Sequence, residues 1–418
     1  MSHSFGPEHP YKTAIATDKI FGCIIGSALG DTIGLYTEFL SKIQSHRRYG
    51  DREFTLLRPR TEPFPDAHRL QFEPCGWTDD TDQALLILLA FLDNRMKGTE
   101  FNLAQDFAER LKIWVDKGLP ALNRPAFDIG INVGAVAGSA HFLRDPVRCA
   151  TERWINGGRK AAPNGSLVRT HPIGVIGVNL TEEQTWRLSV DLGRTTHVDP
   201  RCVVACCISV GLVRQLLRGQ IKTEKDMDAA IKRAYKWMRE QPDIMNPDPS
   251  ADLTGDQIRK HLDGQEFEKH VFAETLEELR LDDQLKMGYV YKCLGSAVLL
   301  LRRALRRIST APTAVGMVAK AQLFEKLIVQ LIMEGGDADT NGAAAGALLG
   351  AYLGYANLPS HWKLGLAHND WLMAKTERLT IAVGVNKGML DSEKDEAADG
   401  GKKSKKKFQM PFTRSRCM

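Results

Sequence analysis

The chain has 418 residues, of which 43% are hydrophobic and 26% are charged, so it is long enough for one large domain or two smaller ones with a sizeable core. Its formal charge is +5, but the last 18 residues hold seven Lys/Arg and no acid, which leaves 49 basic against 51 acidic residues in the body. The basic pI therefore belongs to the tail, and the composition gives no support for a nucleic-acid-binding fold.

The first residues, MSHSFGPEHPYK, lack the apolar core that a signal peptide requires. The eight cysteines form no C-x-x-C pair, and three of them, Cys202, Cys206 and Cys207, share one apolar stretch. This pattern favours buried, reduced thiols in a cytoplasmic or nuclear protein over a disulfide or zinc framework. No P-loop, G-x-G-x-x-G, H-E-x-x-H or G-x-S-x-G motif occurs, so Walker-type phosphate transfer, zinc proteolysis and serine hydrolysis lack their usual signatures.

Helical periodicity dominates the chain. In chain order, the expected helices cover residues 18–39, 80–94, 103–117, 182–193, 200–218, 224–240, 289–307, 319–334, 339–355 and 375–385. Strand-like alternation is scarce, and the prolines fall between these segments. We therefore expect an all-α fold in which residues 18–390 form a single domain.

Several stretches lack a long helical pattern. Residues 45–76 and 157–177 are rich in loop signals, and we interpret 241–283 as a loop-rich insertion with short helices of its own. Residues 391–418 are charge-blocked and poor in aromatics, which is typical of a disordered basic tail. The lysine run at 402–407 fits either a solvated flexible tail or a nuclear-localisation or polyanion patch.

Glycines recur at every fourth residue in the first expected helix and in 339–355. They are Gly22, Gly26, Gly30 and Gly34 in one segment, and Gly342, Gly346, Gly350 and Gly354 in the other. Because residues four apart share a helix face, and each helical glycine costs about 1 kcal/mol relative to alanine, this spacing indicates close backbone approach. Neither segment has the roughly 18 uncharged apolar residues of a membrane span. We expect two packed core helices and no membrane association, with Asp31 and Glu38 near Asp337 and Asp339.

Two acidic clusters precede apolar helical patterns, GWTDDTD at 76–82 and GGDADTNG at 335–342, and neither has Lys or Arg within five residues. Helix capping is the alternative interpretation of either cluster taken alone. The second cluster also begins like an EF-hand loop, but Leu348 stands where that loop needs a glutamate, so the EF-hand is rejected. Two such groups of oxygen donors indicate a site for a hard cation such as Mg²⁺, Mn²⁺ or Ca²⁺.

Short motifs follow one another along most of the chain. They are G-x-x-x-G-D-x-x-G-x-x-x-E at 26–38, W-T-D-D-T at 77–81, F-D-I-G at 127–130, N-G-S-L-V-R at 164–169, T-H at 196–197, G-Y at 288–289 and G-G-D-A-D-T-N at 335–341. In this order they resemble the motifs of the ADP-ribosylglycohydrolase family, which includes the dinitrogenase-reductase-activating glycohydrolase. The resemblance covers about residues 18–360 and implies a single orthogonal multi-helix bundle.

The resemblance further implies a dinuclear Mg²⁺ or Mn²⁺ centre. By matched position its ligands are Thr78, Asp79, Asp80, Asp337, Asp339 and Thr340. Two hard metals can polarise a substrate oxygen and lower the pKa of bound water. Glu38, Asp80 and Asp128 are then the candidate catalytic residues, with Glu38 acting as a base or as a gate to the metals. The alternatives are an ordinary surface carboxylate for Glu38 and a turn residue for Asp128.

Substrate binding is assigned by the same resemblance. The matched residues are Asn164, Gly165, Ser166, Arg169, His197 and Tyr289. Backbone N–H groups and the hydroxyl of 164–166 would meet a diphosphate, but Pro163 stands where the family usually has glycine, so this loop must donate differently. Arg169 fits a structural cation equally well, and His197 fits a helix cap or a core partner. His171 has no matched counterpart and is expected to be a loop histidine.

Three functions follow from the resemblance. The first is hydrolysis at C1″ of an ADP-ribosyl group, which releases ADP-ribose from a modified side chain or another O- or N-linked acceptor. The second is a phosphohydrolase that converts ADP-ribose 1″-phosphate to ADP-ribose and phosphate at the same metals. The third, a non-catalytic ADP-ribose-binding protein, is disfavoured because all six matched ligand positions are intact. The expected partner is an ADP-ribose-containing molecule or an ADP-ribosylated protein, with no nucleic acid for the folded domain. The acceptor, the choice of metal and the oligomeric state stay open.

Overall fold

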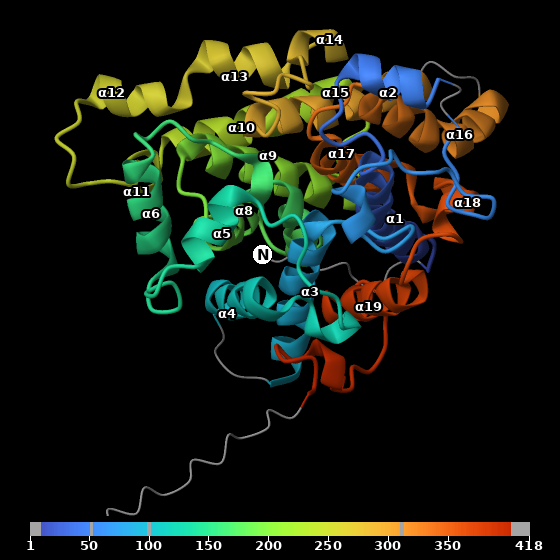
Figure 1. Ribbon diagram of the computed structural model, residues 1–418, viewed down its shortest axis with the longest axis horizontal. Helices are drawn as coiled ribbons and strands as arrows, with labels where there is room; N and C mark the ends of the chain where they lie inside the picture. The colour runs from blue at the N-terminus through green and yellow to red at the C-terminus, as the bar shows by residue number, and fades with distance from the viewer. Residues whose placement is uncertain (1–9, 51–52, 98–101, 310–312, 403–418) are drawn as a thin grey trace, which may run out of the picture.

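The computed structural model describes residues 10–50, 53–97, 102–309 and 313–402, and the regular structure of this part of the chain is helical (Figure 1). Apart from two isolated bridges, Leu119↔Arg124 and Pro163↔Tyr289, no strand pairing occurs among these residues. The all-α prediction is therefore confirmed.

With one exception, the longer helices overlap predicted ones, and α4 and α8 have the predicted limits. They are α1 (Pro10–Gly34), α3 (Asp79–Lys97), α4 (Leu103–Lys117), α6 (Pro146–Asn156), α8 (Glu182–Gly193), α9 (Pro200–Leu217), α10 (Glu224–Arg239), α15 (Val290–Ser309), α16 (Thr313–Ile332), α17 (Ala338–Leu353) and α19 (Asn369–Ala382). The sequence pattern misses α6 and several short helices. These are α2 (Lys42–Arg48), α5 (Ile131–Ala137), α7 (His171–Ile176) and α18 (Ser360–Lys363). The expected insertion has short helices of its own: α11 (Pro242–Met245), α12 (Gly255–Arg259), α13 (Gly264–Val271) and α14 (Leu276–Leu279).

Short 3-10 turns join the helices. They are η1 (Arg69–Gln71), η2 (Pro120–Leu122), η3 (Asn164–Ser166), η4 (Val168–Thr170), η5 (Gly177–Asn179), η6 (Lys260–Leu262), η7 (Tyr355–Asn357) and η8 (Lys394–Glu396). Two of them, η3 and η4, carry the N-G-S-L-V-R motif and lie against α3, α9 and α17. The motif is therefore held by the core and not by a free loop.

Helices α1 and α17 lie side by side in the core (Figure 1). Their glycines face one another. A Cβ atom on Gly30 would stand 2.0 Å from Gly342 O, and one on Gly346 would stand 2.1 Å from Gly26 O. These distances leave no room for a side chain, so the two backbones are themselves in contact. The close approach predicted from the glycine repeat is confirmed, and we call this contact the glycine seam.

Apolar helices enclose the glycine seam. Helices α3, α9, α15 and α16 pack around α1 and α17, and α9 is buried along nearly its whole length. By length and composition, Thr13–Gly34 and Pro200–Leu217 could each cross a membrane, but 61% and 94% of these windows are buried inside the protein. Their apolar surface is thus covered in the core, where burying one Leu or Ile side chain contributes roughly 1.5–3 kcal/mol.

The first helix ends earlier than predicted. It stops at Gly34, and residues 35–39 form a turn that finishes with Phe39 at a φ of 58°. Phe39 N donates to Gly336 O at 2.6 Å, which ties this turn to the loop before α17. Helical periodicity cannot reveal such a bond, because its partner lies almost 300 residues away.

The segment 391–402 belongs to the folded part of the chain, in contrast to the disordered tail predicted from residue 391. The side chain of Lys375 on α19 is 1% exposed and pairs with Glu393 and Asp395. Acidic residues of a segment whose composition suggests disorder thus neutralise a buried lysine. Residues 403–418, with most of the lysine run, lie outside the described residues.

We expect Gly30→Ala to destabilise the protein by about 3 kcal/mol, because overpacking a closed core displaces backbone. Chemical denaturation measures the loss. Gly193→Ala is the matched control: it is a buried helical glycine of α8 whose added Cβ would meet Cys206 Sγ at 3.9 Å. Helix propensity makes this control neutral or stabilising by up to about 1 kcal/mol. Equal stability of the two variants would contradict the tight backbone packing at the glycine seam.

Candidate functional site

The two acidic clusters meet on one side of a pocket of about 980 Å³. Glu38 comes from the turn after α1, Asp79 and Asp80 from the first turn of α3, and Asp337 and Asp339 from the start of α17. Far apart in sequence, these carboxylates are brought together by the packing of α1 on α17. Thr340 also lines the pocket, and Thr78 lies directly behind it.

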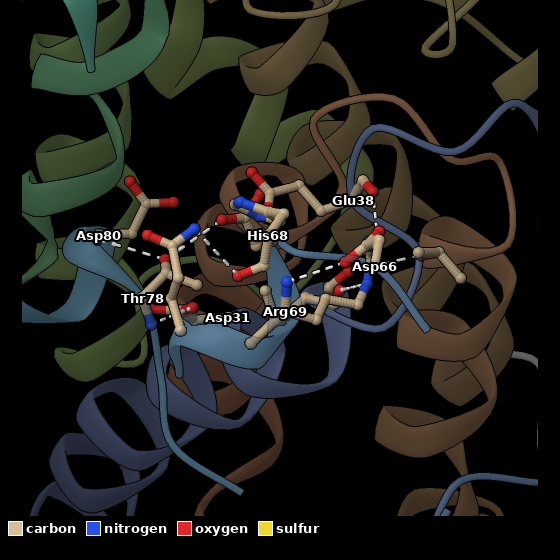
Figure 2. Close-up of polar contacts among 12 residues, drawn as sticks. Asp31, Glu38, Asp66, His68, Arg69, Thr78 and Asp80 are labelled. Carbon is tan, nitrogen blue, oxygen red and sulfur yellow. Dashed lines mark hydrogen bonds and ion pairs between the residues drawn. The ribbon is translucent and has the colours of Figure 1, made fainter. Parts of the chain in front are cut away.

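Asp31, on α1, holds the N-terminus of α3 in place (Figure 2). Its carboxylate accepts hydrogen bonds from Thr78 N at 2.9 Å, from Thr81 N at 3.0 Å and from Thr81 Oγ1 at 2.5 Å. A carboxylate is stabilised there because the first N–H groups of a helix have no partner within it. Asp31 thereby fixes the turn that presents Asp79 and Asp80.

Two glycines shape the loop before α17. Gly335 and Gly336 have φ values of 71° and 69°, which glycine adopts without steric cost. Gly336 N donates to Leu40 O at 2.8 Å, and Gly336 O accepts from Phe39 N. The loop is thus paired with the turn that carries Glu38, so Glu38 lies beside the carboxylates of α17.

Neutral donors orient those carboxylates. Thr78 Oγ1 donates to Asp339 Oδ2 at 3.1 Å, and Asn164 Nδ2 donates to Asp337 Oδ2 at 2.8 Å. Neither bond neutralises a charge. The cluster is therefore positioned by hydrogen bonds and its negative charge stays uncompensated.

No described lysine or arginine forms an ion pair with Asp31, Asp79, Asp80, Asp337 or Asp339. Burial, reinforced by the neighbouring carboxylates, raises the pKa of Asp79, Asp80 and Asp339 well above the usual range. Asp80 Oδ2 and Asp339 Oδ1 are buried and have no hydrogen-bond partner among the described residues. Uncompensated buried carboxylates require either protons or a bound cation.

The donor set fits a hard divalent cation. Carboxylate and threonine oxygens without nitrogen or sulfur suit Mg²⁺ or Mn²⁺. One ligand atom from each of Glu38, Asp337 and Asp339 can be chosen so that all lie within 4.8 Å of one another. Two orphaned carboxylate oxygens, on Asp80 and Asp339, provide further free acceptors in the same cluster.

Asp82, in the same sequence motif, has a different environment. Its oxygens accept from Trp77 Nε1 at 2.8 Å and from Trp114 Nε1 at 3.0 Å, and Arg124 Nη1 lies 3.3 Å away. This acid is compensated and serves the core. Asp80, within one turn of the same helix, instead has a buried oxygen without a partner among the described residues.

Glu38 faces a histidine that the sequence analysis misses. His68 Nε2 lies 2.7 Å from Glu38 Oε2 (Figure 2). The neighbouring Arg69 anchors this loop, since its Nε donates to Leu35 O at 2.7 Å. Ligand atoms of Glu38, His68 and Asp128 also lie within 4.8 Å of one another. Burial, followed by the charges of nearby carboxylates, raises the pKa of Glu38 well above its usual range. No motif surrounds His68, so only the fold reveals it.

Four of the predicted substrate-binding residues line the pocket: Asn164, Gly165, His197 and Tyr289. Asp128 lines it as well. Tyr289 OH donates to Glu266 Oε1 at 2.8 Å. Because Glu266 belongs to α13, the expected insertion supports one wall of the pocket.

Three residues of the N-G-S-L-V-R motif are placed differently from the expectation. Asn164 N already donates to Gly288 O at 3.0 Å, so it is not a free backbone donor for a diphosphate. The Ser166 side chain is buried against Cys206 Sγ at 3.5 Å. Arg169 is 1% exposed and lies beneath the pocket lining. The structure therefore uses Asn164 to orient an acid and buries the other two side chains.

His171 is a core histidine and not a loop residue. It begins α7, with Nδ1 3.2 Å from Val168 O and 3.4 Å from Ser27 Oγ. Burial lowers its pKa to about 4, so the ring is neutral at physiological pH. Pro163 lies in the bridge to Tyr289, which positions the segment before Asn164.

The sequence profile of the ADP-ribosylglycohydrolase family matches residues 12–388. Among similar proteins, the ADP-ribosylarginine hydrolase Tri1 of Pseudomonas putida (strain GB-1) is 24% identical over 87% of this chain and 78% of its own length. The ADP-ribosyl-[dinitrogen reductase] glycohydrolase of Rhodospirillum rubrum is 24% identical over 88% and 98%. The ADP-ribosylhydrolase ARH3 of Xenopus tropicalis is 22% identical over 84% and 91%.

One solved structure, named ADP-ribosylglycohydrolase-related protein complex, aligns with 88% of this chain and 99% of its own at a TM-score of 0.49 and 21% identity. The family match covers most of the chain and agrees with the resemblance found in its motifs.

We expect Mg²⁺ or Mn²⁺ to raise the unfolding temperature, and to do so more at about pH 7.5 than at about pH 5. Burial and the neighbouring carboxylates raise the pKa of Asp79, Asp80 and Asp339 well above the usual range in the folded protein. Such groups bind protons more tightly when folded, so the stability of the metal-free protein falls as pH rises above the usual carboxyl range. A cation replaces the proton, and at about 100 times its Kd it adds roughly 2.7 kcal/mol. Thermal melts with metal or chelator at both pH values measure the effect.

Asp339→Asn should abolish most of this metal response. Asp82→Asn is the control: it should lower stability yet keep the response, because Asp82 is paired with two tryptophans and Arg124 and is not among the residues that line the pocket. An Asp339→Asn protein that responds to metal like the wild type would contradict the site.

Proposed function

The chain belongs to the ADP-ribosylglycohydrolase family, and on this basis we propose that it is a metal-dependent hydrolase that cleaves the bond at C1″ of an ADP-ribosyl group. It releases ADP-ribose from a modified protein side chain or another O- or N-linked acceptor. The proposal is carried by the uncompensated carboxylates at one side of the pocket. At about 980 Å³ this pocket is near the upper end of the roughly 300–1,000 Å³ that small-molecule sites span.

The proposed cofactor is a pair of Mg²⁺ or Mn²⁺ ions. Their ligands would be Thr78, Asp79, Asp80, Asp337, Asp339 and Thr340. When bound, two such ions polarise a substrate oxygen and lower the pKa of a coordinated water. Asp31 supports this set from behind, because it holds the turn that presents Thr78 and the two acids of α3.

Glu38 and His68 are the proposed proton-transfer pair. Glu38 Oε2 and His68 Nε2 lie 2.7 Å apart, a distance at which a proton can pass between them. Glu38 lines the pocket together with the acidic clusters, whereas His68 is not among the lining residues and its side chain is 20% exposed. A proton taken up at Glu38 Oε2 therefore has an outlet towards solvent. A ligand atom of Asp128 lies within 4.8 Å of those of Glu38 and His68, so its carboxylate adds a polar group beside this proton path.

The same cluster of acids supports a second candidate. Two hard cations also suit hydrolysis of a phosphate ester, so ADP-ribose 1″-phosphate would fit the same acidic side of the pocket. The names of the Pseudomonas and Rhodospirillum relatives point instead to ADP-ribosylated protein, with arginine as the first acceptor to test.

One assay separates these functions. The protein with Mg²⁺ or Mn²⁺ is offered ADP-ribosylarginine, ADP-ribosylserine, ADP-ribose polymer and ADP-ribose 1″-phosphate, and the release of ADP-ribose and of phosphate is followed. We expect release of ADP-ribose from an amino-acid linkage, and loss of at least about 10³-fold in rate for Asp79→Ala and Asp339→Ala. Phosphate release alone would favour the second candidate. Tight binding of ADP-ribose without any release would identify a reader, and full activity of both variants would refute the metal mechanism.

His68→Ala and His68→Gln test the proton pair. If His68 exchanges a proton, both should lower kcat about 10²-fold, because glutamine donates a hydrogen bond but does not titrate. His361→Ala is the matched control, since His361 forms a surface pair with Glu325 at 3.3 Å. Wild-type kcat in His68→Gln alone would reduce His68 to a residue that orients Glu38.

A further inference from the structure

A buried arginine links the acidic cluster to the pocket histidine. Arg169 is 1% exposed, and its guanidinium carbon lies 4.8 Å from the centre of the Phe107 ring. Nη1 donates to Gln83 Oε1 at 3.0 Å, and Nη2 donates to Thr196 Oγ1 at 2.6 Å. Both partners are neutral, and no described carboxylate forms an ion pair with this cation. A buried charge without an ion pair is costly, so a role beyond charge balance is needed to explain it.

One arm of the guanidinium reaches a carboxylate of the acidic cluster. Arginine only donates and a carboxylate only accepts, so Gln83 must present Oε1 to Arg169 and Nε2 to Asp79. Gln83 Nε2 lies 2.8 Å from Asp79 Oδ2. This bond occupies one oxygen of Asp79 and leaves the other free to face a cation.

The other arm sets the position of a hydrogen on His197. Thr196 Oγ1 accepts from Arg169, so its own hydroxyl hydrogen is available to His197 Nδ1, 2.7 Å away. With Nδ1 as acceptor, the hydrogen of the neutral ring sits on Nε2. The opposite tautomer would aim two donors at one oxygen and leave the hydroxyl hydrogen unused. Burial and the nearby Arg169 charge hold the pKa of His197 well below its usual value, so the ring is neutral.

His197 lines the pocket, and its Nε2 is a buried atom. The side chain is 3% exposed and lines the pocket, and Nε2 has no hydrogen-bond partner within the part of the chain that the structure describes. A Cβ on Gly165 would lie 3.6 Å from Nε2, so the backbone of the N-G-S motif runs directly beside this donor. A buried donor without an acceptor costs about 1–3 kcal/mol, which a ligand oxygen would remove.

We propose that Arg169 is a positioning residue that orients two groups, His197 and Asp79. Through Thr196 it keeps the hydrogen of His197 on Nε2, where it donates to an anionic oxygen of the substrate, and through Gln83 it holds Asp79 for the metal. That the oxygen belongs to the diphosphate of ADP-ribose rests on the function proposed above. Arg169 itself never touches the substrate, and one buried side chain thereby links substrate affinity to metal affinity.

Nuclear magnetic resonance measures the effect on His197 directly. Long-range proton–nitrogen spectra of protein labelled with ¹⁵N-histidine show which ring nitrogen of His197 carries hydrogen, and the His197→Gln spectrum assigns its signals. We expect Nε2–H in the wild-type protein without ligand, with Nδ1 shifted by an accepted hydrogen bond. Thr196→Ser should keep that shift and Thr196→Val should lose it. Thr195→Val is the matched control, because this neighbouring buried threonine donates to Leu192 O at 2.7 Å. It takes no part in the chain of hydrogen bonds Arg169–Thr196–His197, which we call the relay.

Binding measurements test both effects, that on ADP-ribose affinity and that on metal affinity. Thr196→Val and His197→Asn should weaken ADP-ribose binding about 10- to 100-fold, whereas Thr196→Ser and His197→Gln, whose amide N–H replaces Nε2–H, should stay within about threefold. Gln83→Leu should weaken Mn²⁺ binding about tenfold, and Thr196→Val should leave it unchanged. Arg169→Met should impair both.

An Nδ1–H tautomer in the wild-type protein, or an Nδ1 signal unchanged in Thr196→Val, would overturn the relay. So would an Arg169→Met protein that binds Mn²⁺ and ADP-ribose normally. The spectra need no ligand, so the proposed function fails separately: an Nε2–H tautomer that responds to Thr196→Val in a protein without affinity for ADP-ribose supports the relay and refutes the proposed substrate.

Discussion

Backbone contact between α1 and α17 is the constraint on which the site depends. The helices touch along glycines, and Ser27 Oγ adds a bond to Ala343 O across 316 positions of sequence. Only at this separation do the turn after α1 and the loop before α17 come within hydrogen-bonding distance. A side chain in the seam would displace one acidic cluster relative to the other. The glycines therefore serve the geometry of the site as much as the stability of the core.

The acids in and around the site differ in what stabilises their negative charge. The carboxylate of Asp31 accepts hydrogen bonds from the free N–H groups of a helix, and that of Asp82 lies beside Arg124 and accepts from two indoles. Asp80 and Asp339 each keep an oxygen without a partner in the described structure. The fold thus surrounds uncompensated carboxylates with neutral donors that fix their direction. A bound cation would find ligands already oriented, which lowers the entropic cost of binding.

Sequence pattern predicts those features that lie within one segment. Periodicity places the long helices, and the glycine interval indicates their closest contact. His68 escapes prediction because its position depends on Arg69 and the backbone of residue 35, and no local pattern encodes that contact. Gln83 and Thr196 look like ordinary polar residues until their shared partner is known. The segment 391–402 has a composition typical of disorder, and its contacts with the distant Lys375 and Arg110 explain why it is ordered.

The C-terminal contacts also bear on when the protein can fold during synthesis. Glu393 and Asp395 satisfy Lys375, and Glu396 O accepts from Arg110 Nη1 of α4 at 2.7 Å. Helix α1 is made long before α17, the helix on which it packs. The apolar surface of α1 therefore stays partly uncovered until α17 has been made, a state that favours aggregation or chaperone capture. A chain that ends before α17 would lack the helix that contacts the glycines of α1.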